Sequence, residues 1–198
     1  MHAPAAGFAD PVADTQSVFR TLMAAMAEPA QARPLARLLD PPAPLVPGLA
    51  AVALALVDQD TPLWLSPELA ASEAVLGFLR FHTAVRITDD PAAAAFALAA
   101  SLDALPPLAA FAQGTDAYPD RSTTVVAAVD VLAAGGPLRF SGPGIRGEAM
   151  ARIEPWPGRV AADLVANRKN FPRGVDLVLV SPAAIMALPR TTEPVGGG

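Results

Sequence analysis

The sequence contains no cysteine, and this absence removes several classes of chemistry at once. Disulfide bonds, thiolate nucleophiles and cysteine-based zinc sites are all excluded. Only two histidines are present, one of them His2, so little imidazole is available for metal binding. Lysine occurs once, at Lys169, which is therefore the one residue that could form a Schiff base with an aldehyde cofactor.

Long apolar runs and an excess of positive charge are lacking as well. The longest apolar runs, Leu49–Val57 and Ala92–Ala100, are far shorter than the roughly 20 residues that a membrane-spanning helix needs. No basic segment followed by an apolar stretch, the pattern of a signal peptide, occurs near residue 1. The net charge of −5 disfavours general binding to a nucleic-acid backbone. We therefore expect a cytoplasmic protein that binds neither membranes nor nucleic acid.

The chain does have abundant apolar residues, at 53% against 17% charged, which is typical of a folded protein. Its 198 residues fit one domain over 1–198, in which we expect residues 1–13 to form an extended arm and 193–198 a flexible tail. Helical and strand patterns interleave along the sequence. This order predicts an α/β fold with a mixed central β-sheet flanked by helices.

In the first half, the clearest helix is predicted from Asp14, whose carboxylate can cap the first turn, to Pro29, which cannot continue the hydrogen-bond ladder. The run over 49–57 is apolar on every side, and its alanine content favours a helix over a strand. Residues 30–48 are expected to form an irregular connecting segment with one short strand, followed after the 49–57 run by a turn at 58–62. We further expect strands at 63–65, 85–87 and 96–98, a helix from Ser66 to about Phe81, and a short helix over 105–112.

The second half is richer in strand patterns. The β-branched run Thr123–Leu132 is typical of one buried strand. Gly135-Gly136-Pro137 predicts a turn after which residues 138–141 pair back as a hairpin. The remaining expectations are a strand at 149–153 that extends the sheet, a helix over 156–168, a strand at 175–180 and a last element at 187–190.

The best candidate ligand-binding site is an anion site formed by Arg80, His82 and Arg190. Arg80 and His82 lie near the end of a predicted helix, where they can form an anion or general-base site or satisfy the last free carbonyl groups of that helix. Arg190 stands beside two threonines and can hold a phosphonate or a nucleotide phosphate. It can equally dock an edge strand against a partner, and the sequence does not separate these roles.

Three other segments have weaker patterns. The glycine-rich segment 141–146 lacks the spacing of a phosphate-binding loop and is better explained by a tight turn. Lys169 lies in the basic segment 168–173, for which we expect a solvated or partner-facing role. Asp58 and Asp60 lack the further oxygen ligands that a cation needs. No set of residues combines a nucleophile, a base and an orienting group, so we assign no catalytic residue, no metal site and no cofactor.

Six short motifs follow one another in a characteristic order. They are Phe19-Arg20-x-Leu22-x-x-Ala25-Met26-x-x-Pro29; Leu56-x-Asp58-x-Asp60-Thr61-Pro62-x-Trp64-Leu65; Leu79-Arg80-Phe81-His82-Thr83; Gly114-Thr115; Leu138-x-x-x-Gly142-Pro143-Gly144-Ile145; and Phe171-Pro172-x-Gly174-Val175-Asp176-Leu177 with Leu188-Pro189-Arg190-Thr191-Thr192. Together they cover roughly residues 8–192. In this order they resemble the PhnH family, subunits of the bacterial carbon–phosphorus lyase system.

The resemblance implies a place in alkylphosphonate catabolism. PhnH proteins join PhnG, PhnI and PhnJ in a core complex that takes part in replacing the adenine of ATP with a phosphonate, which gives a ribose 1-phosphonate 5-triphosphate. The radical cleavage of the C–P bond belongs to PhnJ and its iron–sulfur cluster, which a chain without cysteine cannot ligate. The resemblance further implies a homodimer in isolation and a fold like the large domain of pyridoxal-phosphate-dependent transferases, without that cofactor.

Two hypotheses of different classes follow. In the first, the chain is a non-catalytic subunit whose sheet edge and apolar faces pack against sister subunits. In the second, it is an enzymatic or nucleotide- or phosphonate-binding subunit that uses Arg80, His82 and Arg190 around a phosphate. A family member that lost its complex and persists as a homodimer is a third possibility.

Overall fold

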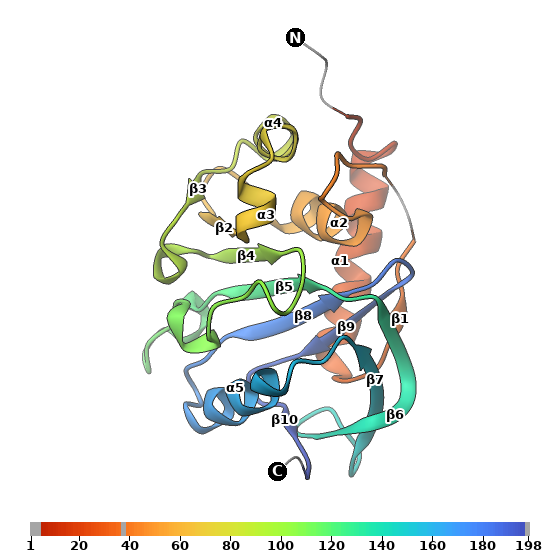
Figure 1. Cartoon of the computed structure of the whole chain (residues 1–198), viewed down its shortest axis with the longest axis vertical. Coiled ribbons are helices and arrows are strands. Elements are labelled where there is room, and N and C mark those ends of the chain that lie inside the picture. The colour runs from red at the N-terminus through yellow and green to blue at the C-terminus, as the bar shows by residue number, and fades with distance from the viewer. Residues whose placement is uncertain (1–4, 37–38, 197–198) are drawn as a thin grey trace.

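The computed structural model describes residues 5–36 and 39–196, and it contains two β-sheets (Figure 1). Residues 1–4 of the expected arm, 37–38 of the connecting segment and 197–198 of the tail lie outside the described residues. The larger sheet has seven strands in the order β1-β9-β8-β5-β4-β2-β3. Its strands are β1 (Arg33–Pro34), β2 (Leu63–Leu65), β3 (Ile87–Thr88), β4 (Phe96–Ala99), β5 (Thr124–Ala128), β8 (Asp176–Val180) and β9 (Ala184–Leu188).

The centre of this sheet is parallel, and its strands are buried on both faces. Strands β8, β5, β4, β2 and β3 run parallel. At one edge β9 pairs antiparallel with β8, and β1 pairs antiparallel with β9. Nearly every residue of β4, β5 and β8 is buried. Parallel strands covered on both sides need such continuous apolar runs, which explains the Val- and Ala-rich sequences. The predicted α/β fold with a mixed central sheet is confirmed.

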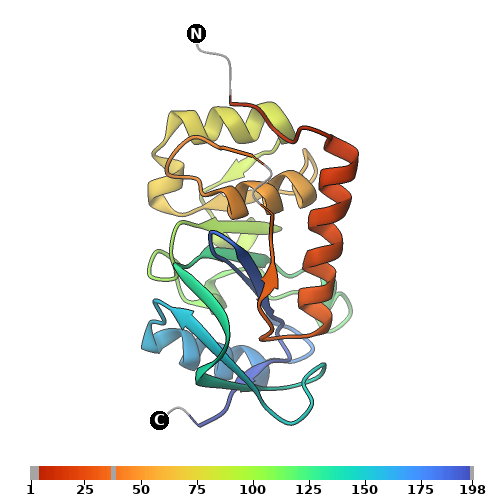
Figure 2. The same cartoon turned by 90° about the vertical axis from the view of Figure 1, so that its right-hand side faces the viewer.

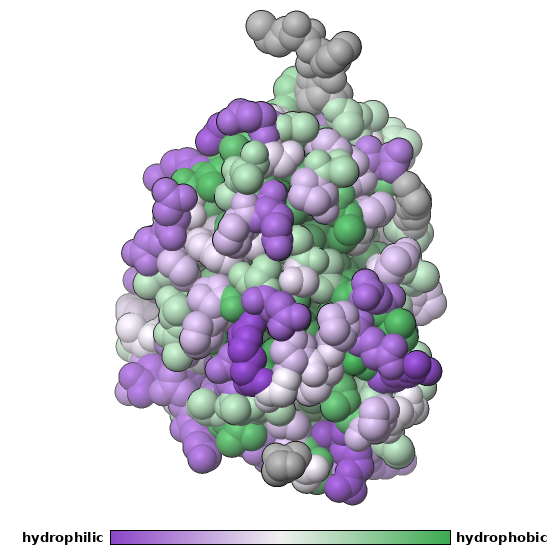
Figure 3. Space-filling model, viewed as in Figure 1, coloured by the Kyte–Doolittle hydropathy of each residue, from purple (hydrophilic) through white to green (hydrophobic). Residues whose placement is uncertain are grey.

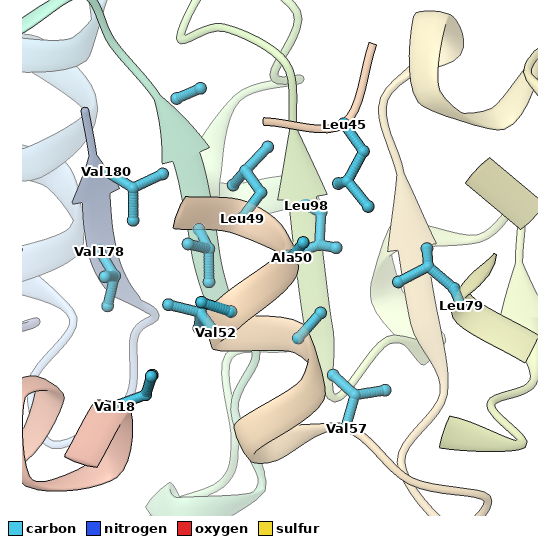
Figure 4. Packing of buried hydrophobic residues seen from close by; sticks show 14 of the residues in the cluster. Val18, Leu45, Leu49, Ala50, Val52, Val57, Leu79, Leu98, Val178 and Val180 are labelled. Atoms are coloured by element: carbon cyan, nitrogen blue, oxygen red, sulfur yellow. The ribbon is translucent and has the colours of Figure 1, made fainter. Parts of the chain in front are cut away.

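Helices cover one face of the large sheet. They are α1 (Pro11–Ala27), α2 (Pro47–Leu56), α3 (Pro67–Ala70) and α4 (Glu73–Thr83). Figure 4 shows α2 lying over the strands, with Leu49 and Val52 near Val178 and Val180 of β8 and Val18 of α1 close by. Burying each large apolar side chain contributes about 1.5–3 kcal/mol, so this cluster is a main source of stability. No helix within the described residues is both long and apolar enough to cross a membrane.

The other face carries a second apolar cluster under α5 (Gly158–Lys169) and a small sheet (Figure 1). The small sheet has the order β10-β6-β7, all antiparallel. It consists of β6 (Val131–Ser141), β7 (Ala149–Glu154) and β10 (Glu193–Pro194). Three 3₁₀ turns complete the described chain: η1 (Pro91–Ala93), η2 (Leu108–Ala110) and η3 (Pro119–Arg121).

The prediction of one strand over Thr123–Leu132 is wrong, because the chain changes sheets within this run. Val129 donates its backbone N–H to Val180 of the large sheet at 2.9 Å, whereas Asp130 donates to Glu154 of the small sheet at 2.8 Å. The β-branched pattern is the same on both sides of the change. The pattern therefore predicts that these residues form strands, but it does not predict which strands they pair with.

The hairpin predicted at residues 135–141 is also wrong. Strand β6 continues through Gly135-Gly136-Pro137 with an irregularity between Ala134 and Leu138, and its hairpin partner is β7. A Cβ atom at Gly136 would lie 2.6 Å from the carbonyl oxygen of Ala151, so glycine is needed for close strand approach rather than for a turn. Within the segment expected to form a flexible tail, residues 193–194 form β10 beside β6.

Several helix boundaries differ from those predicted. Helix α1 begins at Pro11, because the carboxylate of Asp10 accepts the N–H groups of Val12 and Ala13 at 3.2 and 3.0 Å, so the extended arm ends before residue 11. The helix expected from Ser66 to Phe81 is interrupted between α3 and α4, where Ser72 caps α4. The strand expected at 85–87 lies at 87–88, and the helix expected over 105–112 is the short η2. The last element expected, at 187–190, is the strand β9, which ends at Leu188, and β10 follows it.

The other predicted elements are confirmed within a few residues. They are the helices α2 and α5, the strands β2, β4, β7 and β8, the turn after Val57 and the short strand β1 in the connecting segment. Strand β7 extends the small sheet rather than the large one. The arm before α1 passes beside α4, and α1 then runs along one side of the molecule (Figure 2).

Prediction of loop stability. The loop after β6 approaches the end of α1 so closely that a Cβ atom at Gly144, which has φ +85°, would lie 2.5 Å from the carbonyl oxygen of Ala27. Gly147 has a similar φ of +73° but open space around it. We expect Gly147→Ala to lower the free energy of unfolding by about 1–2 kcal/mol through backbone strain. Gly144→Ala should lower it by clearly more, and equal losses in urea titrations would contradict the close approach.

Candidate functional site

A cavity of about 380 Å³ lies where the parallel strands β4, β5 and β8 end. Residues that follow these three strands line it, among them Ser101, Asp130 and Ser181. In open α/β sheets, ligands bind in the crevice outside the carboxyl ends of the strands. The volume is within the lower range of small-molecule sites.

The start of helix α2 forms another part of the cavity lining, through Val46, Pro47 and Gly48. A Cβ atom at Gly48 would lie 3.0 Å from Cβ of Val180, so glycine allows α2 to pack closely against the end of β8. No side chain caps this helix start. The cavity is therefore lined by three strand ends and a helix end that are each fixed by the core.

The polar groups at the cavity are few. The Ser101 hydroxyl accepts the N–H of Ala104 at 3.2 Å, and the Ser181 hydroxyl donates to the carbonyl oxygen of Ala184 at 3.5 Å. The carboxylate of Asp130 is exposed and makes no hydrogen bond or ion pair with any residue that the structure describes. The other lining residues are glycine, alanine, valine and proline. Among the described residues that line it, there is one carboxylate and no basic side chain.

This cavity is not among the predicted sites, although the sequence contains a signal for it. Ser101, Asp130 and Ser181 each follow an apolar strand within one or two residues of its end. Carboxyl ends of parallel strands meet at one edge, so polar residues in this position indicate a shared site. The signal was hidden because Asp130 was assigned to the interior of a single strand.

Arg190 is tied into a network at the opposite edge of the sheet, where β5 and β8 begin. Its guanidinium group donates to both carboxylate oxygens of Asp176, at 3.2 and 2.6 Å, and to the Ser122 hydroxyl at 2.6 Å. It also donates to the carbonyl oxygens of Pro119 and Pro172, at 2.6 and 3.5 Å. These five bonds equal the five N–H donors of an arginine, and the side chain is only 15% exposed. Arg190 therefore has no donor left for a ligand unless this network opens.

His82 has a structural partner as well. Its Nε2 atom donates to the carbonyl oxygen of Ala5 at 2.9 Å, which fastens the N-terminal arm to the last turn of α4. The imidazole packs against Phe78 and Phe81, with ring centroids 4.6 and 5.0 Å away. Arg80 is exposed in the same turn and has no polar side-chain partner among residues 5–36 and 39–196. Of the three predicted residues, Arg80 has the freest side chain.

The structure does not bring Arg190 to Arg80 and His82. Arg190 follows β9, whereas α4 leads into β3 at the far edge of the sheet, and β8, β5, β4 and β2 lie between these two strands. Ligand binding by Arg80, His82 or Arg190 stays a prediction, and it would involve separate places on the surface. On the face shown in Figure 3, hydrophilic residues form several separate groups rather than one continuous patch.

The weaker candidates have local partners. Asp58 accepts the N–H of Asp60 at 2.9 Å within a turn, and the glycines of 141–146 pack against neighbouring backbone. Lys169 is exposed at the end of α5, and Arg173 of the same segment pairs with Asp116 at 3.4 Å. Among the described residues, no group of three or more acidic or histidine side chains is placed to hold a metal ion.

Helix α1 leaves a row of large apolar side chains uncovered. Val12, Phe19 and Met23 are 69%, 44% and 43% exposed, while Val18 and Leu22 on the inner side are buried. Residues spaced by seven and four lie on one side of a helix, so the three exposed residues form a stripe, here called the α1 outer face. Large exposed apolar patches mark interaction sites in soluble proteins.

Comparisons with known proteins give one consistent result. A family model described as "Bacterial phosphonate metabolism protein (PhnH)" matches residues 6–194. Alpha-D-ribose 1-methylphosphonate 5-triphosphate synthase subunit PhnH of Rhizobium meliloti (strain 1021) is 46% identical over 187 residues, which cover 94% of this chain and 92% of that protein. Putative C-P lyase subunit protein HtxG of Stutzerimonas stutzeri is 34% identical over 184 residues, covering 90% and 84%.

Prediction of the role of Arg190. Arg190→Met leaves the partly buried carboxylate of Asp176 without its cation, so we expect the free energy of unfolding to fall by up to about 3–5 kcal/mol. The matched control is Arg139→Met, which removes an exposed ion pair with Glu148 and should cost less than about 1 kcal/mol. Adding Asp176→Leu to Arg190→Met should restore part of the loss. Similar denaturation midpoints for the two single variants would show that Arg190 is not structural.

Proposed function

The chain belongs to the PhnH family of bacterial phosphonate metabolism proteins, and on this premise we propose that it is a non-catalytic subunit of the carbon–phosphorus lyase core complex. The named relatives are subunits, one of a synthase and one, putatively, of C-P lyase. The observation that supports the role most directly is the α1 outer face, because a soluble subunit exposes such a row of apolar side chains where a partner covers it.

The proposed reaction is the transfer of an alkylphosphonate to C1 of the ribose of ATP, with displacement of adenine. The name of the Rhizobium relative supports this step, since its product is a ribose 1-methylphosphonate 5-triphosphate. In this proposal the chain supports the reaction as part of a transferase and lyase assembly rather than supplying its reactive groups. The internal bonds of Arg190 and His82 support that division, because these groups already serve the fold.

The proposed partners are PhnG, PhnI and PhnJ, in the cytoplasm, with a homodimer as the form of the isolated chain. Phe19 and Met23 are the anchors that we propose for a contact with a sister subunit, because large side chains near the centre of an interface contribute most of the binding energy. A likeness of the fold to the large domain of pyridoxal-phosphate-dependent transferases is part of the same proposal. The exposed position of Lys169 fits a domain of that kind that does not bind the cofactor.

Prediction of assembly. Co-expressed with PhnG, PhnI and PhnJ, the wild-type chain should elute with them in gel filtration. Phe19→Ser/Met23→Ser should reduce co-purification at least about tenfold, because two apolar anchors worth roughly 1.5–3 kcal/mol each are replaced by polar groups. Met150→Ser/Phe171→Ser is the matched control, since both residues are exposed to a similar degree on other elements and should leave assembly unchanged.

Circular dichroism of each variant shows whether it is folded, so that loss of assembly is separated from loss of structure. If the wild-type chain elutes apart from all three partners, the subunit role is refuted. If only the control variant loses the partners, the role stands but the α1 outer face is the wrong surface.

A further inference from the structure

Two loops lie side by side at the edge of the large sheet where β5 and β8 begin, on the left in Figure 1. Residues 113–121 lead into β5, and residues 168–175 include the end of α5 and lead into β8. Arg190 donates to one carbonyl oxygen in each loop, and Gly174 donates its backbone N–H to the carbonyl oxygen of Gln113 at 2.9 Å. The two loops therefore form one connected surface, here called the amino-edge surface.

Each loop exposes one large aromatic side chain with an arginine over its ring. Tyr118 is 52% exposed, and Cζ of Arg121 lies 4.2 Å from its ring centroid. Phe171 is 54% exposed, and Cζ of Arg168 lies 5.4 Å from its ring centroid. Aromatic residues and arginine are enriched at protein–protein interfaces. Stacking also orients the planar guanidinium group, so less freedom is lost when its N–H groups bind a partner.

The amino-edge surface is also basic. It contains four basic and two acidic residues, whereas the whole chain has 14 basic and 19 acidic residues. Arg121, Arg168 and Lys169 make no hydrogen bond or ion pair with any residue that the structure describes, and Arg173 pairs with Asp116 at 3.4 Å. Complementary charge steers a partner to such a surface, and the acidic remainder of the chain repels an acidic partner elsewhere.

A hollow of about 280 Å³ borders the amino-edge surface beside Lys169 and Asn170. Leu108 contributes to its apolar wall, so the hollow has room and contact for one side chain of a docked segment. Asp163, the one carboxylate among the described residues that line it, is paired with Arg159 at 3.4 Å. The surface thus combines an anchor site with cations beside it.

These features favour a protein over a nucleic acid as the partner. Four basic residues on a chain of net charge −5 provide few of the phosphate contacts on which nucleic-acid binding depends. A carboxylate, in contrast, matches the fork of a single arginine with two parallel hydrogen bonds. The aromatic rings and the hollow add the apolar contact that a protein segment with mixed side chains can use.

We propose that the amino-edge surface docks an acidic segment of another protein, with carboxylates on Arg121, Arg168 and Arg173 and one apolar side chain in the hollow. Of the two roles expected for the basic segment 168–173, this is the partner-facing one. Arg190 is a positioning residue for the surface, because it joins the loops that carry the arginines. The surface is separate from the α1 outer face, and its partner is a protein other than PhnG, PhnI and PhnJ.

An acidic peptide of sequence EELEELEE is the probe, and QQLQQLQQ is its uncharged counterpart. In ¹H–¹⁵N spectra of the purified chain, EELEELEE should cause saturable shifts confined to the amides of the amino-edge surface and the hollow. QQLQQLQQ should bind at least about tenfold more weakly, because hydrogen bonds between charged groups are lost. Binding of EELEELEE should also weaken as salt is added, since exposed charges are screened.

Arg121→Glu/Arg173→Glu is the decisive variant, because it replaces attraction by repulsion at two of the three arginines. It should weaken EELEELEE at least about tenfold. Arg139→Glu/Arg152→Glu is the matched control, since it makes the same change in net charge at two exposed, ion-paired arginines of the small sheet. The control should change the affinity by less than about twofold, because salt screens distant charges. Arg121→Gln, which only removes a charge, should give an intermediate loss, and circular dichroism shows whether each variant is folded.

Three results would overturn the proposal. They are no saturable shift with EELEELEE, equal binding of the two peptides, or an equal loss of affinity in the variant and its control. Tighter binding of octathymidylate than of EELEELEE to the same surface would also overturn it, because the partner would then be a nucleic acid. None of these results bears on co-purification with PhnG, PhnI and PhnJ, so failure here and failure of the proposed function are distinguishable.

Discussion

The ion pair between Arg190 and Asp176 holds together the edge of the large sheet at which the parallel strands begin. Asp176 starts β8, Arg190 follows β9, and the guanidinium group also bonds to Ser122 just before β5. One partly buried side chain thus connects two neighbouring strands and the loops around Pro119 and Pro172. All five N–H donors of the Arg190 guanidinium group are used within the fold. Breaking this network would leave charged groups without partners, which is destabilising. A group with this role is poorly suited to bind and release a substrate.

Because Arg190 and Asp176 serve the fold, binding must use other groups of the molecule. The Arg190 network occupies the edge of the large sheet at which the parallel strands begin. Separate apolar clusters cover the two faces of the sheet. The cavity at the carboxyl ends of the parallel strands and the α1 outer face lie outside these fixed parts of the fold. The first is a small, mostly apolar space, and the second is a group of exposed apolar side chains. Both fit a protein that contributes binding surfaces to an assembly.

The sequence predicted elements well where local patterns decide the structure. The apolar strands β4, β5 and β8 and the alanine-rich helix α2 follow from composition and length alone. The predictions failed where contacts between residues far apart in the sequence determine the structure. The change of sheets at Val129 and Asp130 depends on partners at Val180 and Glu154, and Arg190 reaches residues 14, 68 and 71 positions away. Its neighbours Thr191 and Thr192 indicated a phosphate site only because those distant partners are invisible in the sequence.

The central claim is that this chain supplies surfaces while other subunits supply the reactive groups. Phosphorus-31 NMR of the purified chain with ATP and methylphosphonate measures this directly, because a ribose 1-methylphosphonate 5-triphosphate has resonances distinct from those of both reactants. The account predicts an unchanged spectrum for the chain alone and the new resonances when the sister subunits are added. A new phosphorus compound formed by the pure chain would contradict it.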